Sequence, residues 1–373
     1  MKIVVNARMM LPNKMDGIGV FTYETMKSIT ETHPGHEYFF LFDRPFSTKY
    51  VFSDNVKPIV LKPAARHPIL WYAWMEYSVF SVLKKIKPDV FIGSDGYIPL
   101  SSDTPSISVI HDINFYHKPK NLPLLTRWYY NYFFPRYAKK ANKIITVSEH
   151  SKKDISQAYH VPPNKISVAY NGASAIFKPI SEKNKISIRT EFSEGKNYFL
   201  FVGTILPRKN IKSLVLAFEK FKISTSKDFK LIIVGKQTSY SKSLLKEINQ
   251  LSSKDDIIFA GRLNTADIHK LYCASTALTF VPYFEGFGIP ILEAMQCETA
   301  VICSNITSLP EVAGDAVCYV DPHSINSISE GMIKTVEDSN YRDELIAKGR
   351  LHSRKFNWEN TADIIWKSIE QFA

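Results

Sequence analysis

The chain has 373 residues, 45% of them hydrophobic and 22% charged, which is enough for two folded domains and excludes a disordered or fibrous protein. Its net charge is +11, and residues 1–180 hold 23 Lys and Arg against 13 Asp and Glu, so nearly all of the excess lies in the first half. A basic half predicts an anionic partner such as a phospholipid surface, a lipid pyrophosphate or nucleic acid, with solubility alone as the other explanation.

The first half alternates short apolar runs with helical patterns, which predicts a parallel sheet with helices on both faces. The first run carries no secretory signal, and the longest apolar run, residues 69–83, is too short to span a bilayer. We therefore expect a cytoplasmic protein that is soluble or peripheral to a membrane. The expected strands of this half are residues 2–6, 38–42, 89–94, 106–112, 143–148 and 165–171.

The first strand-to-helix turn contains Gly17 and Gly19. This spacing lacks the third glycine and the acidic partner of a dinucleotide site, so we expect no nicotinamide cofactor. A later buried strand ends at His111, followed by Asp112. An imidazole there can donate to a sugar hydroxyl or a leaving oxygen, although a histidine at a strand end is more often structural.

Aromatic and basic residues interleave in residues 69–87 and 124–143. Trp and Tyr beside Lys and Arg suit a membrane interface, but packing in the core explains most of these aromatics equally well and is the interpretation we favour. No recognised nucleic-acid-binding module accompanies the charge, so nucleic acid is not an expected partner.

The second half repeats the scheme after residues 174–185, a polar segment with a proline that lacks helical periodicity and suits a hinge. The chain ends in a helical pattern with one apolar face, for which Asn357 is the expected N-cap. Two doubly wound α/β domains result. The expected strands of this half are residues 198–203, 229–235, 256–261, 277–282, 300–304 and 316–320.

The four cysteines lie in the second half without CxxC spacing. This spacing indicates neither a zinc site nor a disulfide scaffold, and free, mostly buried thiols in a reducing cytoplasm are the simplest expectation.

Two basic residues follow the first strand of the second half. Gly203 ends that strand, and Arg208 and Lys209 precede a helix for which Asn210 is the expected cap. Ligands of doubly wound sheets lie beyond the carboxyl ends of the strands, where an Arg and a Lys can grip a pyrophosphate. A solvated basic turn is the alternative.

The most informative pattern is "FEGFGIPILEAM", residues 284–295, in which Glu285 and Glu293 stand eight positions apart. Its glycines allow a tight turn, and Pro290 suits the first turn of a helix. The N–H groups of the turn and the positive end of the helix predict an anion site between two carboxylates that accept hydrogen bonds from hydroxyls. An anion flanked by hydroxyls describes a nucleotide sugar. The alternative is a turn without any ligand, because glycine loops open helices in many α/β proteins and the helix dipole alone favours Glu near a helix start. The turn consists of Gly286, Phe287, Gly288 and Ile289.

In combination these motifs resemble the retaining glycosyltransferases of family 4, which have the GT-B architecture. The resemblance covers almost the whole chain, with two departures: Gly203-Thr204 stands where many members have Gly-Arg, and Gln296-Cys297-Glu298 lacks the common glycine. The motifs that carry it are "FEGFGIPILEAM", "SLPEVAGDAVCYVDP" (308–322), "GTILPRKN" (203–210), "GIG" (17–19), "HD" (111–112), "VSEHSKKDI" (147–155) and "VAYNGAS" (168–174).

The resemblance implies two Rossmann-like domains that face a central cleft. Residues 1–177 would bind the acceptor, residues 178–356 the nucleotide sugar, and the last helix, residues 357–373, would cross back to the first domain. No cofactor or metal is implied beyond the donor, which would be GDP-mannose or a UDP-sugar. The implied acceptor is a glycan or a lipid-pyrophosphate-linked glycan of a bacterial surface polysaccharide, with peripheral contact between the basic half and an anionic membrane.

Residue roles follow from the same resemblance. Glu285 would contact the hydroxyls of the donor sugar and Glu293 those of the ribose. Arg208 and Lys209 would bind the diphosphate. The remaining expected site residues are His111 against the reacting sugar, Gly17 and Gly19 near the phosphate, Asn171 lining the cleft, and Gly203, Gly286, Phe287, Gly288 and Ile289 around the donor.

We expect front-face transfer, in which the leaving phosphate oxygen deprotonates the acceptor hydroxyl while Arg208 and Lys209 stabilise the diphosphate. Double displacement needs two carboxylates about 5 Å apart across the bond, whereas Glu285 and Glu293 would contact different sugars of the donor. Two alternatives remain open from the sequence: a glycoside phosphorylase or hydrolase on the same fold, and a noncatalytic basic protein that binds lipid or nucleic acid.

Overall fold

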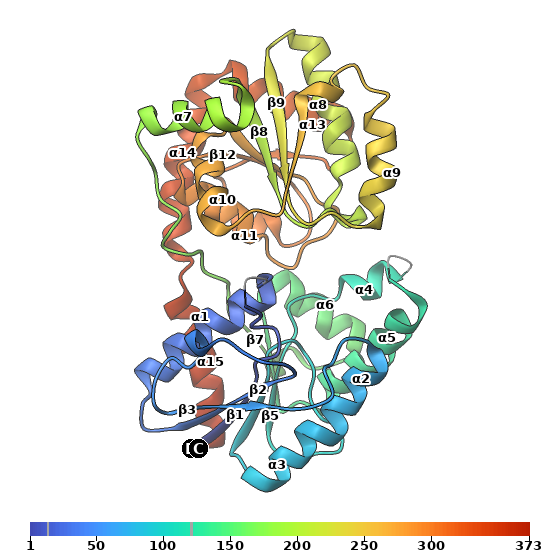
Figure 1. The fold of residues 1–373 in the computed structure, drawn as a ribbon, viewed down its shortest axis with the longest axis vertical. Helices are drawn as coiled ribbons and strands as arrows, with labels where there is room; N and C mark the ends of the chain where they lie inside the picture. Colours follow the sequence, from blue (N-terminus) through green and yellow to red (C-terminus); the bar gives the residue numbers. More distant parts are fainter. Residues whose placement is uncertain (13–14, 120–121) are drawn as a thin grey trace. The chain divides into compact units, whose positions relative to one another are not determined.

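The computed structural model describes residues 1–12, 15–119 and 122–373. Within these residues the chain divides into two compact units, of which unit 1 is Met1–Asn171 with Asn357–Ala373 and unit 2 is Gly172–Phe356. Each unit is built on a parallel sheet with helices on both of its faces (Figure 1). The doubly wound α/β arrangement expected for each half is therefore present.

The sheet of unit 1 has the strand order β3-β2-β1-β4-β5-β6-β7. The order reverses between β1 and β4, which pair directly, so this is the switch point at which ligands of doubly wound sheets bind. The strands are β1 (Lys2–Asn6), β2 (Glu37–Phe42), β3 (Val56–Val60), β4 (Val90–Gly93), β5 (Ser106–Val109), β6 (Lys143–Thr146) and β7 (Ile166–Val168).

Strand β3 is absent from the sequence-based expectation. Its run contains Pro58, which cannot donate to a sheet and argues against a strand unless the strand is at an edge. The structure places β3 at the edge of the sheet, where Pro58 pairs with Phe40 of β2 on one side only.

The helices of unit 1 include one helical stretch that changes its hydrogen-bonding pattern twice, from α to π and back to α. Its π-helical part contains the buried Glu76, whose carboxylate accepts hydrogen bonds from the N–H groups of Leu100 and Ser101 at 2.7 and 3.1 Å. The helices are α1 (Gly17–Thr32), α2 (Pro68–Ala73), the π-helix η2 (Trp74–Val79), α3 (Phe80–Ile86), α4 (Asn114–His117), α5 (Leu124–Lys140), α6 (Glu149–Tyr159) and α15 (Trp358–Ile369).

The chain returns to unit 1 through α15, as the resemblance predicts. Asn357 caps this helix by accepting from the N–H of Asn360 at 2.8 Å. Helix α15 packs against α1, and Trp366 stacks on His33 with ring centroids 3.6 Å apart.

The aromatic segments of unit 1 are divided between the core and the surface. Tyr129 and Tyr137 of α5 are buried and join their hydroxyls at 2.8 Å, as core packing predicts. Core packing was expected for most of these aromatics rather than all, and Trp128 and Tyr132 of the same helix are exceptions, with 56% and 41% of their surface exposed. Helical periodicity puts neighbouring aromatics on opposite faces, which composition alone does not resolve.

The sheet of unit 2 has the order β10-β9-β8-β11-β12-β13, with its switch point between β8 and β11. The strands are β8 (Asn197–Val202), β9 (Phe229–Val234), β10 (Ile257–Gly261), β11 (Ala277–Phe280), β12 (Ala300–Ser304) and β13 (Cys318–Val320). The helices are α7 (Glu182–Ser193), α8 (Ile211–Thr225), α9 (Ser239–Ile248), α10 (Thr265–Ala274), α11 (Ile289–Gln296), α12 (Leu309–Ala313), α13 (Ile325–Glu337) and α14 (Ser339–His352).

Part of the expected hinge is helical. Residues 182–185 form the first turn of α7, whose N-cap is Ser181 with its side chain accepting from the N–H of Asn184. The hinge expectation is therefore wrong from residue 182 onward, because a serine cap followed by Glu182 favours a helix start even where the apolar pattern is weak.

Candidate functional site

The candidate site of unit 2 lies at its switch point, beyond the carboxyl ends of β8 and β11. Gly203 directly follows β8 and donates its N–H to the carbonyl of Val234 at 2.9 Å. The segment from Gly203 leads through a 3₁₀ turn, Pro207–Lys209, into α8, while the segment after β11 leads into α11. The topology thus brings the two motifs singled out in the sequence to the same edge of the sheet.

Arg208 and Lys209 converge on the carboxylate of Glu285. The Arg208 guanidinium donates to Glu285 Oε1 at 2.6 Å and to the carbonyl oxygen of Phe284 at 3.1 Å. The Lys209 ammonium contacts the same carboxylate oxygen. Lys209 and Glu285 are both buried, so this is a largely desolvated ion triad rather than a solvated basic turn.

Further contacts around the triad hold the segment after β8 and the segment after β11 in place. The Lys209 ammonium lies 5.0 Å from the centroid of the Phe280 ring, and the N–H of Tyr283 donates to the carbonyl of Arg208 at 2.8 Å. Ser308 donates its hydroxyl to the carbonyl of Glu285 at 2.9 Å. These bonds hold Glu285 from its backbone as well as from its carboxylate.

Asn210 precedes α8 but does not cap it with its side chain, so the expected capping role is wrong. Its backbone is left-handed, with φ of 59°, and its amide donates instead to the carbonyls of Val281 and Pro322 at 2.9 and 2.8 Å. The side chain therefore joins the segment after β8 to the segment after β11. Its Oδ1 is buried without a hydrogen-bond partner among the described residues.

The glycine turn opens α11 as the sequence predicts. Gly288 has φ of 104°, and a Cβ there would lie 2.7 Å from Leu309 Cδ2, so both conformation and space require glycine. Helix α11 begins at Ile289 with Pro290 in its first turn. Gly286 and Phe287 are buried, and the Phe287 ring packs on Phe356 with centroids 5.9 Å apart.

Glu293 lies one turn inside α11 and accepts a hydrogen bond from the Tyr272 hydroxyl at 2.8 Å. Burial raises the pKa of Glu293 to about 7, although the bond from Tyr272 opposes this shift. Tyr272, a buried residue of α10, was not among the predicted site residues. Nothing in the local sequence marks it, because its partner lies 21 positions away.

In unit 1, His111 follows β5 near the switch point. Its Nε2 lies 3.2 Å from the carbonyl oxygen of Ser94, and the Phe21 ring meets the imidazole edge-on at 4.9 Å. Burial lowers the pKa of His111, which favours a neutral ring with Nε2–H donating to Ser94. Nδ1 is then an acceptor, so this arrangement favours accepting from a hydroxyl over the expected donation.

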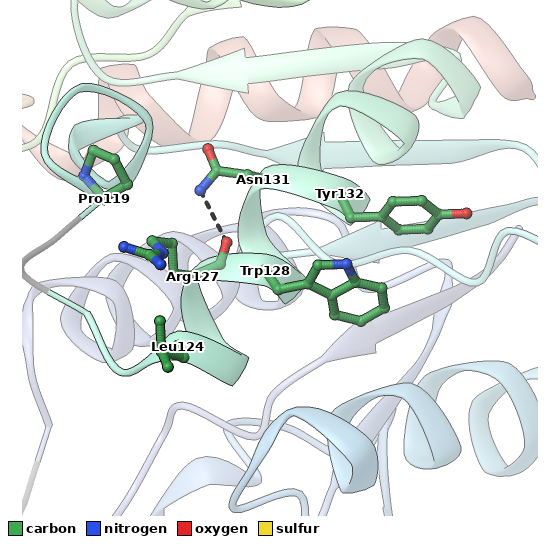
Figure 2. A pocket seen from close by; sticks show the side chains of 6 residues that line it. All are labelled: Pro119, Leu124, Arg127, Trp128, Asn131 and Tyr132. Carbon is green, nitrogen blue, oxygen red and sulfur yellow. Dashed lines mark hydrogen bonds between the residues drawn. The ribbon is translucent and has the colours of Figure 1, made fainter.

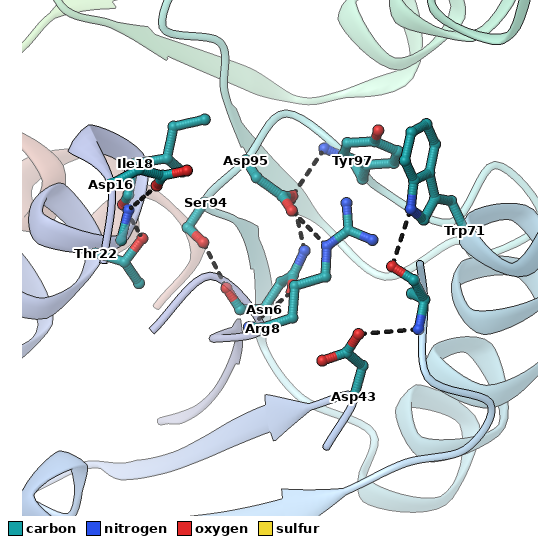
Figure 3. Close-up of polar contacts among 12 residues, drawn as sticks. Asn6, Arg8, Asp16, Ile18, Thr22, Asp43, Trp71, Ser94, Asp95 and Tyr97 are labelled. Carbon is teal, nitrogen blue, oxygen red and sulfur yellow. Dashed lines mark hydrogen bonds and ion pairs between the residues drawn. The ribbon is translucent and has the colours of Figure 1, made fainter. Parts of the chain in front are cut away.

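A polar network that the sequence analysis missed lies at the carboxyl ends of β1 and β4 (Figure 3). Asp95 accepts from Asn6 Nδ2 at 2.8 Å and from Arg8 Nε at 2.6 Å, and the Arg8 guanidinium lies 4.3 Å from the centroid of the Tyr97 ring. Burial lowers the pKa of Arg8, but Asp95 and Tyr97 outweigh it and raise the pKa above its ordinary value. The available signal was Asn6 at the end of one expected strand and Asp95 directly after another, although the sequence does not show which residues pair.

Of the two glycines in the first turn, only Gly19 is required by a close contact, since a Cβ at Gly17 would meet open space. Gly17 is the first residue of α1, and the N–H of Gly19 donates to the capping Asp16 at 3.1 Å. A Cβ on Gly19 would lie 2.4 Å from the carbonyl oxygen of Met9. Asn171, also a predicted site residue, is buried, and its Oδ1 has no hydrogen-bond partner among the described residues.

The predicted site residues thus form two groups. Unit 2 brings Arg208, Lys209 and Glu285 into contact and holds Gly203 and the glycine turn beside them along the chain. Glu293 is held by Tyr272. His111, Gly17, Gly19 and Asn171 belong to unit 1.

Both halves of the chain match glycosyltransferase families. The family model described as "Glycosyl transferases group 1" matches residues 182–352, and that described as "Glycosyltransferase Family 4" matches residues 15–175. The chain is 30% identical to the O-antigen chain mannosyltransferase RfbU of Salmonella typhimurium over 76% of its own length and 75% of that protein. It is 29% identical to the O-antigen chain mannosyltransferase B of Escherichia coli over 74% and 73%.

Solved structures share the fold over the full chain. Anabaena Alr3699/HepE, solved with UDP and glucose, superposes with a TM-score of 0.79 at 17% identity and covers 100% of both chains. WaaG, a glycosyltransferase of lipopolysaccharide biosynthesis, superposes with a TM-score of 0.74 at 17% identity and covers 100% of both chains. At this level of identity the likeness concerns the fold.

Proposed function

Because the chain belongs to glycosyltransferase family 4, with the GT-B fold, we propose that it transfers mannose from a nucleoside-diphosphate sugar to a bacterial surface glycan. Family membership favours a glycosyltransferase over the two alternatives that the sequence left open, a phosphorylase or hydrolase and a noncatalytic binding protein. The observation that carries the proposal is the convergence of Arg208 and Lys209 on Glu285 at the switch point of unit 2, next to the turn that opens α11.

The two cations bind the diphosphate of the donor. A guanidinium pairs with phosphate oxygens through parallel N–H groups and an ammonium acts as a point charge, and both are fixed here before any donor arrives. The N-terminus of α11 adds N–H groups and the positive end of its dipole. Fixed charges of this kind stabilise the charge that develops on the leaving diphosphate, so the proposal needs no divalent metal.

The carboxylates recognise hydroxyls. Glu285, held in place by the cations and by Ser308, accepts from hydroxyls of the donor sugar. Glu293 accepts from the ribose, with Tyr272 orienting its carboxylate. Glu285 is already committed to two cations, which makes it a poor nucleophile and favours a mechanism without a covalent enzyme intermediate.

The proposed transfer proceeds on one face of the sugar with retention. The bond from the anomeric carbon to the phosphate oxygen breaks, and a bond from the same carbon to the acceptor oxygen forms. The proton of the acceptor hydroxyl passes to the departing phosphate oxygen. The products are the elongated glycan and a nucleoside diphosphate, whose charge Arg208 and Lys209 stabilise.

The sugar and acceptor are inferred from relatives. The two O-antigen mannosyltransferases support mannose and a surface polysaccharide, and we propose GDP-mannose as the donor, with a UDP-sugar as the competing choice. Unit 1 binds the glycan or lipid-pyrophosphate-linked acceptor. His111 and the network of Arg8 and Asp95 lie at the switch point of that unit and supply its hydrogen-bonding groups.

We further propose that unit 1 rests on the anionic inner face of the cytoplasmic membrane, through α2, η2 and α5. Among the described residues, no helix is both long and apolar enough to cross a bilayer. Helices α2 and α5 pack together. Together with η2, these helices expose seven large side chains that we call the apolar face: Ile69, Tyr72, Tyr77, Leu124, Leu125, Trp128 and Tyr132.

A surface hollow of about 680 Å³ lies on α5 within this face and is lined by Leu124, Arg127, Trp128 and Tyr132 among others (Figure 2). The Trp128 and Tyr132 rings stack with centroids 5.2 Å apart, and Arg136 lies over Tyr132. Aromatic rings beside cations suit the headgroup layer of an anionic membrane.

Vesicle flotation tests the membrane contact. Leu124→Ser with Trp128→Ser should release the protein from vesicles that contain anionic lipid. Ile223→Ser, which removes a side chain that is 69% exposed on α8 of unit 2, should leave it bound. Equal flotation of both variants would refute the contact.

A thermal-shift screen followed by a transfer assay tests the function. GDP-mannose should raise the Tm of the full chain more than UDP-sugars do, and the product glycosidic bond should keep the anomeric configuration of the donor by NMR. The absence of a shift with every nucleotide sugar, or an inverted product, would contradict the proposal.

A further inference from the structure

Three side chains that ligate soft metals converge in unit 2 at a place that the proposed reaction does not use. His269 and Cys273 lie one turn apart on α10 and so share a helix face, and Cys297 directly follows α11. One ligand atom from each lies within 4.8 Å of the other two. Both thiols are buried and free, and His269 is partly exposed.

The backbone of Lys178 lies at the point where these side chains meet. Its carbonyl oxygen is 2.6 Å from His269 Nε2 and 3.3 Å from Cys273 Sγ. The Cys297 thiol lies within 4.8 Å of both the Cys273 thiol and a ring nitrogen of His269. An imidazole, two thiols and a carbonyl from three separate segments therefore face one another.

We propose that His269, Cys273 and Cys297 bind a Zn²⁺ ion, with the carbonyl oxygen of Lys178 as the fourth ligand. Imidazole with thiolates is a ligand set that zinc prefers, and a site closed by four protein ligands is structural rather than catalytic. Zinc at about 2.3 Å from sulfur and about 2.0 Å from nitrogen places ligand atoms roughly 3.3–3.8 Å apart, which small side-chain movements from the observed separations achieve.

The cysteine spacing does not indicate this site, because its ligands come from a helix, the end of a second helix and the segment before α7. Binding would tie these three segments together. It would also connect them to the donor site: Tyr272 precedes Cys273, and Glu293, which it hydrogen-bonds, lies one turn before Cys297. This second consequence rests on the proposed function, whereas the metal site itself does not.

Cobalt titration tests the site directly. The full chain, reduced and stripped of metal with a chelator, should bind one Co²⁺ with a thiolate-to-cobalt charge-transfer band and the intense visible bands of a tetrahedral ion, and Zn²⁺ should abolish both. Cys273→Ser and Cys297→Ser should lose the charge-transfer intensity and weaken binding by more than about 100-fold, since even outer partners of zinc ligands contribute 10- to 100-fold. Cys318→Ser, in β13, is the control that should bind normally.

The cobalt titration of the unmodified chain tests the metal site even if a variant fails to fold. Lack of a charge-transfer band, or a band that persists in both cluster variants, would overturn the proposal. Oxidation of Cys273 and Cys297 to a disulfide in a chain that binds no metal would also overturn it. The measurement involves no sugar transfer, so a chain that binds cobalt but no nucleotide sugar would refute the proposed function alone.

Discussion

Arg208 and Glu285 are separated by 77 positions in the chain, yet the guanidinium of one donates to the carboxylate of the other at 2.6 Å. The pair joins the segment after β8 to the segment after β11, and Lys209 completes it from the neighbouring position. The carboxylate and the two cations hold one another in place, and under the proposed function the cations are positioned for a diphosphate.

Lys209→Ala should lower kcat by roughly two to three orders of magnitude, because it removes a preorganised cation that stabilises the leaving diphosphate. Steady-state kinetics with saturating donor measures the effect. Lys212→Ala is the matched control, since Lys212 lies on the next turn, is exposed and pairs with Glu247 at 2.6 Å. Unchanged turnover in the Lys209 variant would refute its assignment.

Donor affinity should depend on pH through Glu293, whose pKa is about 7 before the donor binds. A charged carboxylate accepts stronger hydrogen bonds than a neutral carboxyl group, so the Kd should fall about fivefold as the pH rises from below to above 7. Glu293→Gln should abolish this dependence in calorimetric titrations. The assignment fails if the variant shows the same pH profile as the parent.

The stability of the folded chain should also depend on pH through Glu293, and the raised pKa of this group determines the direction of the dependence. The folded chain keeps the proton of Glu293 up to about pH 7, whereas the unfolded chain loses it near the ordinary value of 4.5. The stabilisation from this group is therefore complete below pH 4.5 and is lost as the pH rises to 7. Across this window the Tm of the parent should fall relative to that of Glu293→Gln, and a parallel course of the two curves would contradict the raised pKa.

Tyr272→Phe should raise the pKa of Glu293 further, because the hydroxyl of Tyr272 favours the ionised carboxylate. The midpoint of the pH dependence of donor binding should move upward. Tyr198→Phe removes a hydroxyl that donates to the carbonyl of Leu271 at 2.7 Å and should leave the midpoint unchanged. Equal midpoints in both variants would show that Tyr272 does not act through Glu293.

Gly288→Ala should lower the Tm by roughly 5 °C or more, because it combines a left-handed backbone with a close approach to Leu309. Gly17→Ala should change the Tm little, since Gly17 starts α1 with open space where its Cβ would lie. Differential scanning fluorimetry without ligand suffices. An unchanged Tm in the Gly288 variant would mean that the turn rearranges freely.

The sequence predicted the strands and the glycine turn well because both depend on local patterns: apolar runs for parallel strands, and a glycine and a proline for the start of α11. It missed β3, whose Pro58 is tolerated only at the edge of a sheet, and edge positions are set by topology. The turn after α11 shows a further limit. Glu298 adopts φ of 54°, a left-handed conformation that usually favours glycine, so this backbone geometry occurs without the residue that usually marks it.

Sequence patterns could not predict which side chains bond to each other when the two residues lie far apart in the chain. The bond from Tyr272 to Glu293 and the ion pair of Arg8 with Asp95 join residues 21 and 87 positions apart. Each involves residue types that are common elsewhere in the chain. Only the strand order brings them together, so they became visible with the fold.

Calorimetric titration of the preferred nucleotide sugar into the parent and Glu293→Gln tests the donor site most directly. We predict that the variant binds about tenfold more weakly, because it loses a charged acceptor for the ribose hydroxyls, while Glu247→Gln at the exposed pair with Lys212 binds like the parent. Equal donor affinity in the parent and the Glu293 variant would contradict the placement of the nucleotide at the switch point of unit 2.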